Sequence, residues 1–286
     1  MAVLVACRAE AATDRRGNIR GTEIQGAVIK VVSYNLRFAS ENDPQPWSRR
    51  RGAMIRLLTE LAPDILGTEE GLDHQLRDLE AGLGAPYQLI GEHRHHDDGS
   101  ENAEEYSAIF YNSETVELIN IDHQWLSDTP SVPGSRTWGT HFPRMFSIAE
   151  FRRRSDRRPF TVITTHVDHE IAAAQVKSAH LLRRRAESVD QDQPLLVMGD
   201  FNVGEDSEPY AILTGGGLRD AYLSATDRGP RLGTFNNYGA PDPDGVRIDW
   251  ILANDLIKVA SARMVDAAPS GQYPSDHLPV EAIVEF

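Results

Sequence analysis

Apolar positions along this chain follow two periods, one typical of strands and one typical of helices. In the first half, segments of helical spacing cover residues 46–63 and 71–84, and Gly84 ends the second of them. Apolar runs rich in β-branched residues predict strands elsewhere, in close succession toward the middle of the chain. These predicted strands are residues 28–36, 64–67, 87–93, 106–112, 116–126 and 146–151. We therefore expect the first half to end in neighbouring antiparallel strands rather than in strand–helix–strand units.

The second half repeats this plan. A helix is predicted over residues 170–190, and the predicted strands are residues 159–167, 194–202, 247–254, 259–265 and 279–286. Because both halves contain the same mixture and no linker rich in proline or serine divides them, we expect two sheets packed on each other with helices outside. The arginine-rich segment 151–160 between the halves is interpreted as a solvated hairpin turn rather than a nucleic-acid-binding patch.

Residues 1–26 differ from the rest of the chain because they carry charge and glycine without any period. We expect a disordered leader there, followed by a single domain over residues 27–286. The four residues LVAC, which end at Cys7, resemble the lipobox of bacterial lipoproteins. The expected location is therefore left open between the cytoplasm and, if the true start lies upstream, export as a lipoprotein. Cys7 is the only cysteine, so no intrachain disulfide can form.

The charge balance narrows the expected partners. With 29 Lys and Arg against 43 Asp and Glu, the formal net charge is -14, which opposes tight non-specific binding to a polyanion. A nucleic acid is therefore a possible substrate but not the favoured one. No segment reaches the roughly 18 apolar residues of a membrane-spanning helix, and we expect a soluble, monomeric protein.

Polar residues able to do chemistry stand where the predicted strands end. Each alone has a structural explanation, since Asn and Asp often cap turns and a histidine after a strand is often a hydrogen-bonded core residue. Together they would crowd like charges at one edge of the fold unless a cation or a phosphate lay there. The residues are Asn35, Glu70, His166, Asp200, Asn202, Asp249, Asp276 and His277.

Seven short motifs place these residues in a familiar order. They read SYNLR, DILGTEE, EYSAIFY, TTHVDH, GDFN, RIDWIL and SDHLP, and the part of the chain that they cover is roughly residues 28–286. In order and approximate spacing the chain resembles the endonuclease/exonuclease/phosphatase superfamily of DNase-I-like metal-dependent phosphoesterases, and its uncharacterised bacterial branch in particular. The resemblance implies an α/β (α+β) four-layer sandwich, in which two mainly antiparallel sheets are flanked by helices.

The resemblance also implies a divalent metal site and a general base. Glu70 would be the main ligand of Mg²⁺ or Mn²⁺, and Asn35 and Asp276 would complete or orient the ligand shell. His277, held by Asp249, would act as the general base or orient the attacking water.

The remaining motif residues would act on the phosphate and the water. Asp200 would position or deprotonate the water, and Asn202 would donate a hydrogen bond to a phosphoryl oxygen. His166, oriented by Glu105, would stabilise the phosphate or protonate the leaving group.

Two residues depart from the family pattern. Glu69 stands where the family usually has Gln, which adds a negative charge beside the metal ligand and either strengthens metal binding or weakens phosphate binding. Arg37 stands where apurinic-site endonucleases carry a further acidic ligand. Arg37 therefore argues against a second strongly held metal and against abasic-DNA repair.

The residues that would recognise the substrate are harder to identify from the sequence than the catalytic ones. Arg144 and Arg247 are the predicted phosphate clamp, since guanidinium binds phosphate through two parallel hydrogen bonds. Loops expected at the rim of the site also contain His93, His95, His96, Arg136, Trp138, His141, Phe235 and Tyr238. The cluster HRHHDD lacks regular metal-ligand spacing and is interpreted as a mobile loop.

Three functions are compatible with this pattern. The favoured hypothesis is a divalent-metal phosphodiesterase or phosphatase that acts on a small or short phosphoester. A nuclease would use the same residues on DNA or RNA. A catalytically silent binding or scaffold protein is a third hypothesis, which the complete set of motif residues disfavours.

Overall fold

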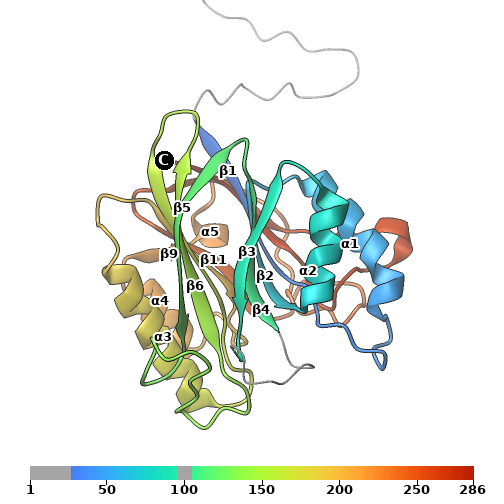
Figure 1. Cartoon of the computed structure of the whole chain (residues 1–286), viewed down its shortest axis with the longest axis horizontal. Helices are drawn as coiled ribbons and strands as arrows, with labels where there is room; N and C mark the ends of the chain where they lie inside the picture. The colour runs from blue at the N-terminus through green and yellow to red at the C-terminus, as the bar shows by residue number, and fades with distance from the viewer. Residues whose placement is uncertain (1–26, 96–104) are drawn as a thin grey trace, which may run out of the picture.

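The computed structural model describes residues 27–95 and 105–286, and Figure 1 shows two β-sheets packed face to face with helices on their outer sides. Helices α1 (Trp47–Leu61) and α2 (Asp73–Leu83) lie outside one sheet, and α3 (Ala172–Glu187) and α4 (Glu208–Thr214) lie outside the other. The four-layer sandwich expected from the sequence is therefore confirmed. The predicted leader lies outside the described residues.

The first sheet has seven strands in the order β10-β12-β13-β1-β2-β4-β3. Its strands are β1 (Val28–Asn35), β2 (Ile65–Gly71), β3 (Tyr87–His93), β4 (Tyr106–Asn112), β10 (Asp227–Arg228), β12 (Lys258–Met264) and β13 (Val280–Glu285). The strands β1 and β2 are parallel and are joined through α1, whereas β13 pairs with β1 in the antiparallel sense.

The second sheet has six strands in the order β5-β6-β7-β8-β11-β9. Its strands are β5 (Val116–Trp125), β6 (Met145–Arg153), β7 (Pro159–His166), β8 (Leu195–Asp200), β9 (Leu218–Asp220) and β11 (Asp249–Asn254). The strands β7 and β8 are parallel and are joined through α3. Short helices α5 (Ala221–Ser224) and η1 (Pro269–Gly271) complete the described elements.

The sheets do not follow the two halves of the sequence. Strands β12 and β13, from the end of the chain, join the first sheet, while β5 and β6, from the first half, join the second. Each sheet also contains a pair of adjacent parallel strands that a helix joins, β1–α1–β2 in the first and β7–α3–β8 in the second. The predicted hairpin turn between β6 and β7 is confirmed, because the Arg153 N–H donates to the Arg158 carbonyl over 2.9 Å. Among the described residues, no helix has both the length and the apolarity needed to cross a membrane.

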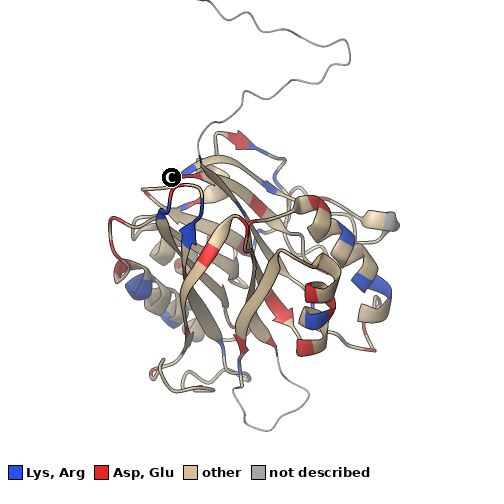
Figure 2. Cartoon of the chain, turned by 45° about the horizontal axis from the view of Figure 1, so that its top comes forward, with Lys and Arg blue, Asp and Glu red and all other residues tan. Residues whose placement is uncertain are grey.

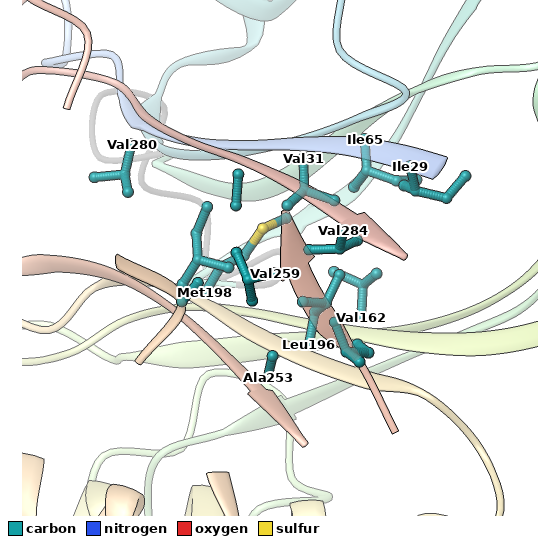
Figure 3. Packing of buried hydrophobic residues seen from close by; sticks show 14 of the residues in the cluster. Ile29, Val31, Ile65, Val162, Leu196, Met198, Ala253, Val259, Val280 and Val284 are labelled. Carbon is teal, nitrogen blue, oxygen red and sulfur yellow. The ribbon is translucent and has the colours of Figure 1, made fainter. Parts of the chain in front are cut away.

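The core consists of one apolar layer between the sheets and one under each helical layer. Figure 3 shows the central layer, where residues such as Val31, Leu196 and Val280 meet between the sheets. Alternation along β1 explains the layering: Val31 points to this central layer, and its neighbour Val32 packs in the layer under α1 and α2. Burial of both faces fixes the register of the central strands and hence the positions of the side chains at their ends.

A close approach of two backbones determines the geometry at the end of β8. Gly199 has a φ of 149°, and a Cβ atom built on it would lie only 1.9 Å from the Thr165 carbonyl oxygen of β7. Only glycine fits there. The absence of a side chain lets β8 run against β7 up to the pair His166 and Asp200, which are opposite each other in the register.

Candidate active site

The predicted site residues gather at one end of the sandwich. A pocket of about 460 Å³ opens there and is lined by Glu70, Glu105, Arg144, His166, Asp200, Asn202, Asp276 and His277 among others. Asn35 and Asp249 lie just beneath these residues and hydrogen bond to them. The arginine-rich β6–β7 hairpin lies at the opposite end of β7, beside the C-terminus (Figure 2), and so does not contribute to the pocket.

Glu70 is held as a carboxylate at the end of the first sheet. Its Oε1 accepts a hydrogen bond from Asn35 Nδ2 over 3.0 Å, and its Oε2 accepts one from the Phe38 N–H over 3.2 Å. Burial alone would raise the pKa of Glu70, but the Asn35 hydrogen bond and the nearby His277 charge outweigh it and lower the pKa. The same Asn35 amide donates to Asp200 Oδ2 over 2.9 Å and so connects the two sheets.

Three carboxyl groups around Glu70 have pKa values that burial raises above their usual range. Burial and then the Asp249 charge raise the pKa of Asp200 to about 7, and the pKa of Asp276 is also raised, again chiefly by burial. Burial likewise raises the pKa of Glu69 well above its usual range, and its Oε2 finds no hydrogen-bond partner among the described residues. The Arg37 guanidinium lies 3.8 Å from both Glu70 and Asp276.

These donors suit a divalent cation. Glu70, His166 and Asp200 each offer a ligand atom within 4.8 Å of the other two, as do Asp200, Asp249 and His277. A hard cation prefers carboxylate oxygen, and its charge would offset the burial and the Asp249 charge that raise the pKa of Asp200. The residues therefore fit the predicted metal, and the possible ligands include Asp200, which the sequence analysis assigned to the attacking water.

His277 is fixed by a buried carboxylate. Its Nδ1 lies 3.0 Å from Asp249 Oδ2, and its Nε2 lies 3.9 Å from Asp200 Oδ2. Although burial lowers the pKa of His277, the charge of Asp249 and its hydrogen bond raise the pKa well above the usual value. Asp249 therefore orients the ring as predicted, and the raised pKa favours the second predicted role of His277, orienting the attacking water, over that of a general base.

His166 is oriented differently from the prediction. Arg144 Nη1 lies 3.1 Å from His166 Nδ1, whereas Glu105 is 4.0 Å away and pairs with Arg94 over 2.6 Å. Because a guanidinium can only donate, Nδ1 must accept, and the proton of the neutral ring is on Nε2. Burial and the Arg144 charge lower the pKa of His166 well below its usual value. Nε2 is 3.7 Å from Asp200 Oδ2 and can donate into the pocket.

Asn202 lines the pocket in a left-handed backbone conformation, with a φ of 55°. Its N–H donates to Asp200 Oδ1 over 2.9 Å, and its side-chain amide donates to the Val167 carbonyl over 2.9 Å. The turn after β8 is thereby tied to the end of β7, which places Asp200 and His166 side by side.

Arg247 is not part of a phosphate clamp in the pocket, so this prediction was wrong. It is 1% exposed, and its guanidinium pairs with Asp220 over 2.5 Å and with Glu205 over 2.8 Å, away from the pocket. Both acids lie in a segment where no helix or strand was predicted, so neither was recognised as a partner of Arg247. Arg144 remains the candidate for the clamp, since it is buried at the pocket wall and also contacts His169 over 2.8 Å.

The rim loops contribute fewer residues than the sequence suggested. Trp138 donates to Asp128 and Arg136 to the His141 carbonyl, so both stabilise their own loop. Of the rim aromatics predicted there, Phe235 lines the pocket. His96 lies outside the described residues.

Sequence reasoning missed Arg94. This residue belongs to the cluster interpreted as a mobile loop, yet its side chain is buried against Glu105, stacks 4.4 Å above Phe142 and lines the pocket. The pocket thus has an acidic end near Glu70 and a basic end near Arg94 and Arg144. Only Arg94's place directly after a predicted strand could have pointed to it.

Comparison with known proteins decides the family. The family model of the Endonuclease/Exonuclease/phosphatase family matches residues 32–277, which include every motif residue of the pocket. The chain belongs to this family. Members of the Endonuclease/Exonuclease/phosphatase family hydrolyse phosphoester bonds, generally with divalent metal ions, and the chain is a hydrolase of this kind.

Relatives of this family member come from bacteria and animals. A structure of a family protein from Bacteroides thetaiotaomicron has a TM-score of 0.84 at 31% identity and covers 92% of this chain and 99% of that one. A mannosyl-6-phosphatase from B. thetaiotaomicron VPI-5482 has a TM-score of 0.82 at 31% identity, covering 90% of this chain and 100% of that one. Protein angel of Drosophila melanogaster is 27% identical over 71% of this chain, and the matched part is 62% of the length of that protein.

Proposed function

We propose that this protein is a Mg²⁺- or Mn²⁺-dependent phosphoesterase that hydrolyses a small phosphoester by attack of water. The observation that supports it most is the meeting of Glu70, Asp200 and His277 at one pocket, each from a different element and each held by a buried partner. Such a constellation needs both sheets in register and has no evident structural purpose.

Glu70, Asn35 and Asp276 are the proposed metal-binding residues, with Asp200 near enough to contribute. When bound, the ion would polarise a phosphoryl oxygen and stabilise charge on the leaving oxygen. The hydrogen bonds of Asn35 and Phe38 orient the Glu70 carboxylate for this purpose.

Asp200 and His277 are the proposed residues for the attacking water. In the metal-free protein the pKa of Asp200 is about 7, so Asp200 can accept a proton near neutral pH. His277, oriented by Asp249, holds the water from the other side. His166 and Asn202 donate hydrogen bonds to phosphoryl oxygens, and Arg144 binds a further oxygen of the same group.

A sugar phosphate is the substrate class we propose to test first. The mannosyl-6-phosphatase at 31% identity supports it, and so does a pocket of about 460 Å³, which is the size of a small-molecule site. The net charge of -14 disfavours a long polyanion. For a nuclease, the rate on oligonucleotides should instead fall steeply with added salt, while the rate on a small diester should not.

Hydrolysis by the metal-stripped protein, with and without Mn²⁺ or Mg²⁺, tests this proposal. The substrates are bis-p-nitrophenyl phosphate, hexose 6-phosphates and a short oligonucleotide, and the comparison variant is His277→Ala. We expect metal-dependent turnover of a small ester that the variant loses. Wild-type protein that binds Mn²⁺ in calorimetry but turns over none of these would argue for a demanding substrate, and protein that binds no metal would argue for a catalytically silent binding protein.

A further inference from the structure

Arg50 is a fully buried cation whose hydrogen bonds go to backbone carbonyls. It projects from α1 and is 0% exposed, and within the described part of the chain its side chain makes no hydrogen bond to a carboxylate. Burial lowers the pKa of Arg50, yet the residue stays charged at neutral pH. A buried charge is costly unless its hydrogen-bond donors are satisfied. The acceptors of these hydrogen bonds therefore show which parts of the chain Arg50 holds together.

Those acceptors account for every N–H of the guanidinium group. The Nε donates to the Gln45 carbonyl over 3.0 Å, Nη1 donates to Leu36 and Pro274, and Nη2 donates to Arg37 and Phe38. Trp47 covers one face of the group, with its ring centroid 4.9 Å from Cζ. Arginine has five such donors in a rigid planar fork, and here five carbonyls receive them.

The carbonyls belong to two loops that support the proposed metal-binding residues. Residues 36–38 directly follow Asn35, and Pro274 comes two residues before Asp276. Phe38 contacts both sides: its carbonyl accepts a hydrogen bond from Arg50, and its N–H donates one to Glu70 Oε2. A hydrogen bond from Ser275 Oγ to the Asn35 carbonyl, over 2.7 Å, joins the two loops directly.

We propose that Arg50 is a positioning residue for the metal site, holding the loop after β1 and the loop before β13 together so that Asn35, Glu70 and Asp276 face one ion. This inference rests on the proposed function. Arg50 does not touch the pocket itself, and it acts through Phe38 and Pro274. Lysine would keep the charge but offers three donors around a point charge, so it cannot span both loops.

Mn²⁺ binding to metal-stripped protein, measured by calorimetry well below the unfolding temperature, tests the inference. The variants are Arg50→Met and Arg50→Lys, and the matched control is Arg51→Met, since Arg51 is the next residue of α1 and pairs with Asp78 at the surface. We expect Kd to rise about tenfold to a hundredfold in both Arg50 variants, the usual cost of losing a residue that orients metal ligands. The control should bind as the wild type does.

A second readout separates positioning from a general loss of stability. If Arg50 acts on the metal site, raising the Mn²⁺ concentration should return kcat toward the wild-type value. Wild-type Kd in a folded Arg50→Met or Arg50→Lys protein would overturn the inference.

If neither Arg50 variant folds, Ser275→Ala removes the direct link between the same loops and should weaken Mn²⁺ binding, whereas unchanged Kd there would count against the inference. Failure of the wild-type protein to bind Mn²⁺ would overturn the proposed function instead.

Discussion

The two sheets bring different chemistry to the same pocket. The seven-stranded sheet supplies Asn35 and Glu70 at the ends of β1 and β2, and Asp276 in the loop before β13. The six-stranded sheet supplies His166 and Asp200, at the ends of its two parallel strands. The two groups meet through the Asn35 amide, which donates to Glu70 on one side and to Asp200 on the other.

Glu70 of the first sheet and Asp200 of the second differ in the direction in which their pKa values are shifted. The pKa of Glu70 is lowered by its hydrogen bonds and the His277 charge against the effect of burial, whereas burial and the Asp249 charge raise the pKa of Asp200 to about 7. A carboxylate that stays ionised suits a cation, and one that titrates near neutral pH suits proton transfer. The difference supports Glu70 as a metal ligand and Asp200 as the residue that accepts a proton from the attacking water.

Replacing Asp200 should give the largest effect. We expect Asp200→Ala to lower kcat by about a hundredfold to ten-thousandfold, the typical contribution of a general acid or base. Steady-state rates at saturating Mn²⁺ measure it, and exposed Asp190→Ala is the control. A near wild-type kcat for Asp200→Ala would remove the proposed distinction between Glu70 and Asp200.

Replacing Glu70 should act mainly through the metal. Because ligand charge sets the affinity for a hard cation, we expect Glu70→Gln to raise the Mn²⁺ concentration for half-maximal rate by roughly tenfold or more. Rates measured over a series of Mn²⁺ concentrations separate this shift from a fall in kcat. Glu60→Gln, an exposed change on α1, should leave the metal dependence unaltered. A lower kcat with unchanged metal dependence would contradict the assignment.

The long elements of the fold were predictable because each has an apolar face that recurs with a local period. Which sheet a strand joins is a non-local property, and periodicity does not encode it. Thus β13 pairs with β1 from the other end of the chain, and the division of the chain into two halves did not anticipate this pairing. Short elements such as α4 and β9 have too few residues for a period to emerge.

The site was predictable where its acidic and histidine side chains lie at the ends of strands. Acids and histidines there converge because strands share an edge, and this logic found Glu70, His166 and Asp200. It failed for arginines, whose long side chains reach partners far along the chain. Arg247 pairs with Glu205 and Asp220 outside the pocket, whereas Arg94, set aside as part of a loop, lines it.

The smallest effect we predict concerns stability at the basic end of the pocket. Burial raises the pKa of Glu105 to about 7, although Arg94 and Arg144 act in the opposite direction. A carboxyl group whose pKa is raised by folding stabilises the protein fully below its unfolded pKa of about 4.3. That contribution is lost as the pH rises through about 7. The free energy of unfolding of wild type minus that of Glu105→Gln should therefore decrease across this window and then level off.

Urea unfolding of metal-stripped protein at a series of pH values measures this difference, because glutamine keeps the shape of the side chain but cannot titrate. Exposed Glu114→Gln is the control and should show no such window. A difference that increased with pH would mean that the ion pair with Arg94 outweighs burial, so that Glu105 would be ionised like Glu70. The contrast between Glu70, whose pKa is lowered, and the carboxyl groups whose pKa is raised would then not extend to the basic end of the pocket.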